Sequence, residues 1–439
     1  MKTNLQCIVD KARAEKKLCF TSLAHHISPE LLRQSLMAQE RKTAVGVDEM
    51  DRDTALREFE TWGPEVLKQI HRQGYRAPPV KRVWIPKPGK SEKRPIGIPT
   101  VIDRAVQRST AIVLSQIYEQ DFLQCSFGGR PQLSAHHAVC TLKEIIQGKK
   151  VDWVLECDLK NFFGSLDHGW IERFLKHRVA DPRIVSLVNR WLKAGVLEEG
   201  ELEPSEFGTP QGGSISVLIS NIYLHYVLDL WFEKRVKGKC RGEVYLVRYL
   251  DDFVICCQYR SDAQQIHIDL EKRLGEFSLS LEPDKTKMLQ FGRFAYRGEH
   301  LVRDKPATFC FLGFTFCCSR NSKGNYLVRM KTDGKRLRRF LSKFREATLK
   351  IRHDSIRNQV KALNAKLRGH FQYYGVGGNT DSLKKVERYC KLQWRKSLSS
   401  RSQRGNLTWE KFSRLLEYFP LAAPKLSLPY QLMPKMVRL

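Results

Sequence analysis

Two adjacent carboxylates, Asp251 and Asp252, stand between two runs whose composition favours β-strands. Residues 244–247 and 253–257 are rich in Tyr, Val, Ile and Phe, so only a tight turn fits between them. Neighbouring carboxylates at the tip of a hairpin repel each other unless a cation neutralises them, and oxygen ligands of this kind suit Mg²⁺. A site that holds two such ions about 3.5–4 Å apart could promote in-line phosphoryl displacement. The alternative is a solvated acidic turn without a ligand.

A third carboxylate, Asp158, ends the apolar run 151–159, where a charged side chain has no packing role. It could be a further metal ligand, or it could cap the helix that follows. The Gly/Pro-rich segment 208–213 precedes a predicted helix over 216–232. Its glycines would let the main chain approach a ligand closely, and Gln211 offers both a donor and an acceptor. An ordinary turn before a helix would have the same composition.

Two basic side chains belong to a predicted β-hairpin with strands over 80–85 and 93–98. Lys87 falls in the turn and Arg94 in the returning strand, and their charges could hold a triphosphate. Residues 309–318 predict a further apolar strand pair, which could be plain core.

Helical patterns must position these segments, and a change of composition predicts a domain boundary near residue 325. The predicted helices cover residues up to about 73, 101–122, the segment from 160 through 179, 216–232, 263–277 and a strongly basic region after about 331.

The chain is basic along its whole length. Its 439 residues carry 76 Lys and Arg against 47 Asp and Glu, a formal net charge of +29. This excess predicts a long polyanionic partner, with nucleic acid favoured over a merely solvated basic surface. We expect no membrane span, because no apolar run reaches the necessary length. The N-terminus lacks the apolar core of a secretory signal, which predicts an intracellular, cytoplasmic protein that could associate with the nucleoid.

The cysteines and histidines give no metal-binding spacing. The 12 cysteines form no Cys-x-x-Cys and no Cys/His set with zinc spacing. Several of them lie in or beside apolar segments, so we expect buried free thiols in a reducing compartment. The neighbouring pair His136 and His137 would point to different faces of a helix, which favours structural roles.

Taken in order, these segments resemble the reverse transcriptases of bacterial group II introns. The resemblance covers nearly the whole chain. The matching segments are 85–88, 94–101, 103–104, 134–136, 158–163, 208–213, 221–225, 249–252, 283–287, 311–314, 363–369 and 373–375, and residues 44–48 resemble the N-terminal extension of that family.

The resemblance implies an α+β fold of the right-hand polymerase type, with fingers, palm and thumb. It implies an N-terminal extension over 1–80, fingers and palm over 81–324, and a helical thumb or maturase X-like domain over 325–400. A basic C-terminal region over 401–439 would follow, as a candidate DNA-binding segment.

The resemblance also implies a role for each matching side chain. Phe163 would act as a steric gate that excludes the 2′-hydroxyl of a ribonucleotide, and Lys285 would protonate the leaving pyrophosphate. The implied ligands of Mg²⁺, or of Mn²⁺ in its place, are Asp158, Asp251 and Asp252. The implied dNTP-binding residues are Lys87, Arg94, Leu159, Phe163 and Gln211, and the implied contacts to backbone phosphates are Arg338, Arg339 and Lys343.

Three residues depart from the family pattern. Leu250 replaces a common Ala beside the primer end, Gly164 replaces an acidic residue, and Gly129 replaces a Phe. The first of these favours a polymerase that serves the host in DNA repair or defence over an intron-encoded maturase, and a catalytically weak RNA-binding scaffold is the third alternative. The expected partners are an RNA or DNA template–primer and dNTPs, with no membrane. The sequence leaves open whether the protein is a monomer or a homodimer.

Overall fold

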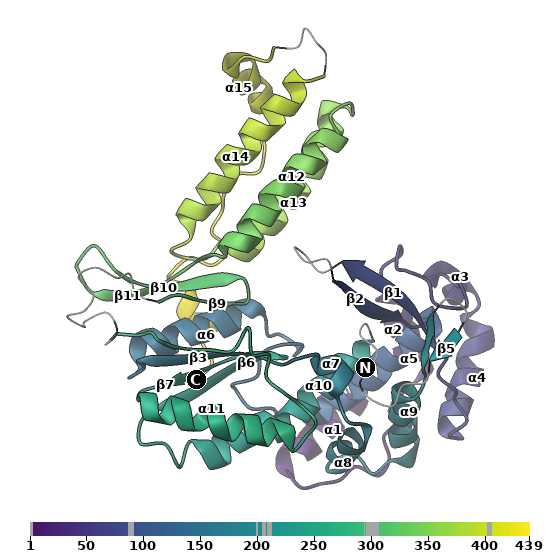
Figure 1. Ribbon diagram of the computed structural model, residues 1–439. Coiled ribbons are helices and arrows are strands. Elements are labelled where there is room, and N and C mark those ends of the chain that lie inside the picture. The colour runs from purple at the N-terminus through teal and green to yellow at the C-terminus, as the bar shows by residue number, and fades with distance from the viewer. Residues whose placement is uncertain are drawn as a thin grey trace.

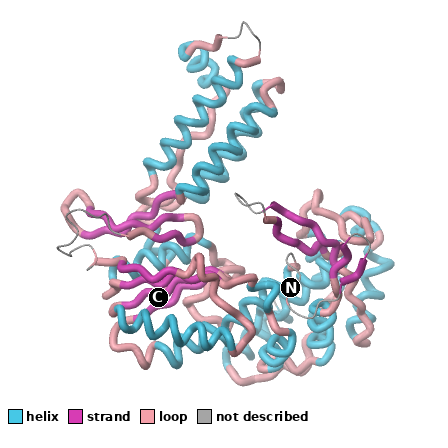
Figure 2. Tube along the Cα trace, in the orientation of Figure 1, coloured by secondary structure: helices cyan, strands magenta, loops and turns pink. Residues whose placement is uncertain are grey.

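A computed structural model describes residues 3–86, 92–198, 201–203, 208, 213–293, 295, 307–401 and 406–439. The described part of the chain is an α+β protein in which three sheets lie among helices (Figures 1 and 2). We name the sheets by their strand orders: the hairpin sheet is β2-β1-β4-β5, the central sheet is β6-β7-β3-β8, and the small sheet is β11-β10-β9. The α+β class is therefore as the sequence predicts.

The N-terminal segment forms helices that pack around the long helix α5, in agreement with the predicted helical pattern. Their bounds are α1 Thr3–Ala14, α2 Pro29–Met37, α3 Arg52–Arg57, α4 Phe59–His71 and α5 Val101–Tyr118. Ser28, Asp51 and Thr100 cap α2, α3 and α5, because each side chain accepts a hydrogen bond from a main-chain N–H of the first turn. These caps account for where the three helices begin.

The hairpin sheet contains the predicted basic hairpin. Its strands are β1 Val80–Pro86, β2 Lys93–Ile98, β4 Val196–Glu198 and β5 Glu201–Glu203. β1 and β2 pair antiparallel, with Ile85 opposite Arg94, as predicted. β4 runs parallel to β1, with Val196 opposite Val80, and it follows helices α8 (His168–Lys176) and α9 (Pro182–Leu192). The sequence does not predict this parallel pairing, because its partners are far apart in the chain.

The central sheet is antiparallel throughout and is covered on both faces. Its strands are β3 Trp153–Asp158, β6 Val244–Tyr249, β7 Asp252–Cys257 and β8 Lys287–Gln290. Leu155 and Ile255 belong to one core with α11 (Arg260–Gly275). Val154 and Val254 belong to a second core with α6 (Ala135–Gly148) and the small sheet. Burial on both faces explains why β6 and β7 are nearly continuous apolar runs and not alternating patterns.

A long apolar helix lies in the core beside the central sheet. It consists of α10 (Ser214–Leu224) and two π-helical turns, η2 (His225–Asp229) and η3 (Phe232–Val236). By length and composition, the stretch Ile215–Val236 could cross a membrane, which contradicts the prediction that no run reaches that length. In the structure, 78% of its most apolar window is buried within the protein, as is usual for a core helix.

The small sheet connects the central sheet to the C-terminal helices. Its strands are β9 Phe309–Phe311, β10 Phe314–Arg320 and β11 Tyr326–Thr332. β11 pairs with β10, so the boundary predicted near residue 325 falls inside this sheet. The physical boundary lies after Thr332, where Asp333 caps α12 by accepting a hydrogen bond from the Arg336 N–H at 2.9 Å. The helices are α12 Gly334–Lys350, α13 Ile356–Tyr374 and α14 Thr380–Ser399, and Figure 1 shows them projecting away from the sheets.

The C-terminal segment is not a separate unit. Helix α15 (Trp409–Tyr418) packs on α14, with the rings of Trp394 and Phe412 at 5.5 Å. The chain then returns to the sheets, where Met433 is buried in the core of α6 and the small sheet. The Arg438 N–H donates to the Thr141 hydroxyl at 2.9 Å. The described part of the predicted region over 401–439 thus contacts both the helical bundle and the body of the protein, and its DNA-binding role stays a prediction.

All twelve cysteines are free, as the sequence predicts. Cys157, Cys256 and Cys257 are buried in the central sheet, whereas Cys310 is exposed, so the prediction of buried thiols is wrong at that position.

Candidate active site

The strand register brings carboxylates from two strands together. Asp158 at the end of β3 lies directly opposite Asp252 at the start of β7. Directly opposed residues of an antiparallel pair have Cβ atoms about 4.5–5.5 Å apart. Glu156 lies two residues before Asp158 and therefore on the same face of the sheet. The site thus contains one more carboxylate than the sequence predicts.

Asp251 occupies the predicted hairpin turn. Tyr249 pairs with Asp252, so Leu250 and Asp251 form a two-residue turn. Leu250 adopts φ of 57°, a left-handed conformation that costs a non-glycine residue of order 1–3 kcal/mol. The turn is tightly packed, since a Cβ atom on Gly128 would lie 2.6 Å from the Leu250 nitrogen.

Gly129 fits the same turn. A Cβ atom there would lie 2.3 Å from Val217 Cγ1 and 3.4 Å from Leu250 Cδ2. Two of the three departures from the family pattern, Leu250 and Gly129, are therefore neighbours in space, and the close packing of Val217 leaves no room for a side chain at Gly129.

A buried ion pair holds the strand that leads into this turn. Arg248 and Asp229 are fully buried, and the guanidinium donates to both carboxylate oxygens, at 2.7 and 2.6 Å. It also donates to Ser126 Oγ at 2.7 Å, to Asn221 Oδ1 at 3.0 Å and to the Leu250 carbonyl at 3.2 Å. Burial alone would lower the pKa of Arg248, but the Asp229 charge raises it. The network fixes the end of β6 and positions the turn through the hydrogen bond to the Leu250 carbonyl.

Lys285 is the cation nearest the carboxylates. Its ammonium group forms an ion pair with Asp158 Oδ2. Burial opposes the charge on this lysine, but the hydrogen bond and charge of Asp158 dominate and raise the pKa of Lys285. In this arrangement Lys285 keeps its proton and neutralises Asp158.

The remaining carboxylates sit in surroundings that disfavour their charge. Burial, then the charges of Asp158, Asp251 and Glu156, raise the pKa of Asp252 to about 7. Burial and Asp158 also raise the pKa of Asp251, while Lys285 and Arg94 oppose that rise. Stacked carboxylates of this kind favour a bound cation.

The donor chemistry fits a hard divalent ion, because carboxylate oxygens are the ligands that Mg²⁺ and Mn²⁺ accept. Within the described part of the chain, however, no three Asp, Glu, His or Cys side chains are placed to hold a metal ion as they stand. Asp158 would first have to release Lys285. The predicted set of three ligands is therefore gathered on adjoining segments but is not arranged as a finished coordination shell.

Arginines from two other elements act on these carboxylates. The positive charge of Arg94 on β2 opposes the rise in the pKa of Asp251. The charge of Arg336 at the start of α12 likewise opposes the rise in the pKa of Asp252. The predicted phosphate contacts Arg338, Arg339 and Lys343 are exposed on α12, further along the same helix.

Phe163 lies in the short helix α7 (Phe162–Ser165), with its ring 5.3 Å from that of the buried Phe162. Gly208 packs against this helix, because a Cβ atom on it would lie 2.6 Å from the Phe163 carbonyl oxygen. The beginning of the Gly/Pro-rich segment thus adjoins Phe163, and Gln211 lies outside the described residues, as does Lys87.

Leu159 follows Asp158, and the resemblance predicts that it contacts a dNTP. Its side chain is 4% exposed and belongs to the hydrophobic core. A contact between Leu159 and a dNTP would therefore involve the main chain, and its dNTP-binding role stays a prediction.

Comparison with known protein families shows which family this chain belongs to. The family described as reverse transcriptase (RNA-dependent DNA polymerase) matches residues 85–316, which include the end of β1, the rest of the hairpin sheet, the central sheet and the carboxylates. The chain belongs to the reverse transcriptase family.

Similar proteins include products of intron genes. This chain is 31% identical to Protein YkfC of Escherichia coli over 273 residues, which cover 55% of this chain and 71% of YkfC. It is 36% identical to the group II intron-encoded protein LtrA of Lactococcus lactis over 170 residues, which cover 38% of this chain and 28% of LtrA. A 91 kDa protein in a cob intron of Schizosaccharomyces pombe is 24% identical over 379 residues, 72% of this chain and 46% of that protein. The predicted resemblance to group II intron reverse transcriptases is confirmed.

Sequence reasoning missed several residues of this candidate site, namely Glu156, Asp229, Arg248 and Arg336. A charged Arg248 in an apolar strand was nevertheless a usable signal. Asp229 gives no such signal, because its place in the core depends on how the π-helical turn η2 packs against β6.

Proposed function

We propose that this protein is an RNA-directed DNA polymerase that extends a primer with dNTPs and also copies DNA. The observation that carries the proposal is the pairing of Asp158 with Asp252, with Asp251 in the adjoining turn, inside a reverse transcriptase domain. By this proposal the hairpin sheet serves as fingers, the central sheet as palm, and α12 to α15 as the thumb of a right-hand polymerase.

The aspartates would hold Mg²⁺, with Mn²⁺ as a substitute, and the bound ions would supply the positive charge that in-line phosphoryl transfer requires. Arg94, which already acts electrostatically on Asp251, would bind the triphosphate. Lys285 would leave Asp158 and give its proton to the departing pyrophosphate oxygen. Lys285 is protonated while it pairs with Asp158, so it carries a proton to transfer when the nucleotide arrives.

Primer extension on matched RNA and DNA templates tests the polymerase activity directly. We expect Asp252→Asn to abolish synthesis while template–primer binding persists, because the side chain keeps its shape but loses the charge that faces the metal. Glu271→Gln is the matched control, since it removes an exposed carboxylate from α11. Synthesis that survives in Asp252→Asn would remove this residue from the site. No synthesis by the unaltered protein would favour an RNA-binding scaffold.

Phe163 should select deoxynucleotides. We expect Phe163→Val to increase ribonucleotide incorporation by about tenfold or more, because a smaller side chain at this position of α7 leaves room for the 2′-hydroxyl. Incorporation from matched rNTP and dNTP mixtures measures this effect, with Tyr259→Ala as a control at an exposed aromatic residue. Unchanged sugar selectivity would contradict the gate.

A second candidate function is that of an intron maturase, and the intron-encoded relatives favour it. A host role in DNA repair or defence rests on Leu250 alone, and no comparison supports it. Primers that pair with the template over only a few bases distinguish these roles. Efficient extension of such primers, abolished by Leu250→Ala, would favour repair, whereas accelerated splicing of a group II intron RNA would favour the maturase.

A further inference from the structure

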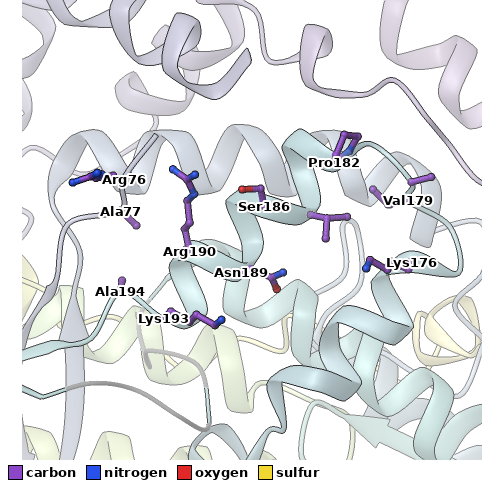
Figure 3. A pocket seen from close by; sticks show the side chains of 12 residues that line it. Arg76, Ala77, Lys176, Val179, Pro182, Ser186, Asn189, Arg190, Lys193 and Ala194 are labelled. Carbon is purple, nitrogen blue, oxygen red and sulfur yellow. The ribbon is translucent and has the colours of Figure 1, made fainter. Parts of the chain in front are cut away.

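A pocket of about 860 Å³ lies against α9 and shares no lining residue with the candidate active site. Figure 3 shows its lining side chains, which come from residues 76–77 before β1, from 176–182 between α8 and α9, and from 185–194 along α9 and beyond it. In Figure 1, α8 and α9 lie below the hairpin sheet, on the side away from the C-terminal helices. The volume falls within the range of about 300–1,000 Å³ that is usual for ligand sites.

The lining of this pocket is strongly cationic. It contains Arg76, Lys176, Arg190 and Lys193 and no Asp or Glu. Glu172 lies behind the pocket, where it pairs with Lys176 at 2.5 Å and partly offsets Lys193. The side chains of Arg76 and Lys193 form no hydrogen bond or ion pair within the described ranges of the chain. Positive charge therefore remains available to a ligand at the pocket.

Hydrogen bonds behind the pocket hold its walls in place. The Arg190 guanidinium donates to the carbonyls of Gln73 and Tyr75, so α9 is tied to the segment that precedes β1. Asp103 joins the same two walls, because it accepts a hydrogen bond from the Tyr75 hydroxyl at 2.8 Å and from Trp191 Nε1 at 2.7 Å. These hydrogen bonds fix the two segments that carry Arg76, Arg190 and Lys193 relative to each other.

We propose that this pocket binds phosphate groups, supplied either by a nucleoside triphosphate or by the backbone of a nucleic-acid strand. Arginine and lysine recognise phosphate by charge and by hydrogen bonds, and the pocket places both kinds on several of its walls. The aliphatic side chains of Ala77, Val179 and Val185 line the same space and could contact a sugar or base.

A bound anion would also link two strands of the hairpin sheet. Arg76 precedes β1 and Lys193 precedes β4, and these strands run side by side where the Val80 N–H donates to the Gly195 carbonyl at 3.2 Å. A phosphate that bridges the two cations would stabilise the base of the sheet that carries Arg94.

Hydrogen–deuterium exchange of the full chain, read by mass spectrometry in EDTA, tests this proposal. The probes are tripolyphosphate, dATP and a short oligothymidylate. We expect slower exchange in residues 74–80 and 176–196 when a probe binds. Arg76→Ala with Lys193→Ala should remove this protection and raise the dissociation constant by about tenfold or more. Lys149→Ala with Lys150→Ala removes the same charge elsewhere on the surface and should leave the protection intact.

The probes distinguish the two sources of phosphate. Protection by the oligothymidylate alone identifies a strand-binding site, and protection by dATP and tripolyphosphate identifies a nucleotide site. No protection of these segments by any probe overturns the proposal, as does protection that survives the Arg76→Ala/Lys193→Ala change. The Asp252→Asn protein should keep the pocket protection even when it no longer extends a primer, so failure of the pocket and failure of the polymerase proposal are separable.

Discussion

At the scale of single residues, the surroundings of Asp252 oppose its negative charge. Burial and the nearby carboxylates raise its pKa to about 7, well above the value of 3.8 for a solvated aspartate. Between these two values the folded protein holds a proton that the unfolded chain has released. The contribution of Asp252 to stability in the absence of metal should therefore fall as the pH rises from about 4 to about 7, and comparison with Asp252→Asn separates it from His225 and His370, whose lowered pKa values act in the opposite direction.

A divalent cation should reverse this trend where Asp252 is ionised. We expect Mg²⁺ to raise the melting temperature more at about pH 8 than at about pH 5.5, because binding at low pH must first displace the proton. Thermal unfolding in Mg²⁺ and in EDTA at both pH values measures the effect, and Asp252→Asn is the control. A stabilisation that is equal at both pH values would contradict the assignment of Asp252 as the metal-facing carboxylate.

At the scale of the elements, the tight turn at Leu250 depends on glycines from another segment. Gly129→Ala should destabilise the protein by about 1–3 kcal/mol, because the new Cβ atom would overlap Val217 Cγ1. Gly324→Ala is the matched control, since Gly324 also has a positive φ but has no atom within 4 Å of its Cβ position. Both changes place an alanine at a positive φ, so both introduce the same kind of backbone strain. The difference between their unfolding midpoints therefore measures the cost of the overlap with Val217. Equal midpoints would show that the overlap with Val217 is easily relieved.

The strand β6 and the turn η2 are joined by the ion pair of Arg248 and Asp229. Arg248→Met should cost about 3–5 kcal/mol, because it leaves a buried carboxylate without a partner. Adding Asp229→Leu should recover much of that stability, and a double-mutant cycle of unfolding free energies measures the coupling.

Arg414→Met removes one partner of an exposed pair and should cost no more than about 1 kcal/mol, which makes it the control. Equal effects of the buried and exposed changes would contradict the central role of the Arg248 network. Primer extension should fall with Arg248→Met as well, because the guanidinium also donates to the Leu250 carbonyl.

At the scale of the whole molecule, the charge of +29 should make nucleic-acid binding strongly dependent on salt. We expect changing Arg338, Arg339 and Lys343 together to Ala to reduce the slope of log affinity against log salt by about 0.7–0.9 for each phosphate that is no longer neutralised. Fluorescence anisotropy of a labelled template–primer at several salt concentrations measures the slope. Changing Lys149, Lys150 and Lys272 together to Ala removes the same charge elsewhere and should leave the slope unchanged; equal slopes in both variants would contradict a specific role for α12.

The three aspartates of the candidate site were predictable from the sequence, whereas the residues that surround and position them were less so. Asp251 and Asp252 stand between two apolar runs, and Asp158 ends a third, so local pattern was enough to select them. Glu156 was not predicted as a site residue because it lies within a run of strand-forming residues. Its proximity to the other carboxylates follows only from the pairing of β3 with β7. Arg336 was not predicted as a site residue because its electrostatic effect on the pKa of Asp252 depends on the direction in which α12 leaves the small sheet.

The sequence by itself determined the hairpins, the helical N-terminal segment, the basic character and the order of the motifs shared with the family, because these follow from local composition and from resemblance along the chain. Only the tertiary structure decided that β4 joins β1, that β11 belongs to the small sheet, and that Arg248 is matched by Asp229. The same holds for the cationic pocket, whose members Arg76 and Lys193 lie far apart in sequence. Contacts between distant segments depend on the packing of whole elements, and no local pattern of residues encodes which elements will meet.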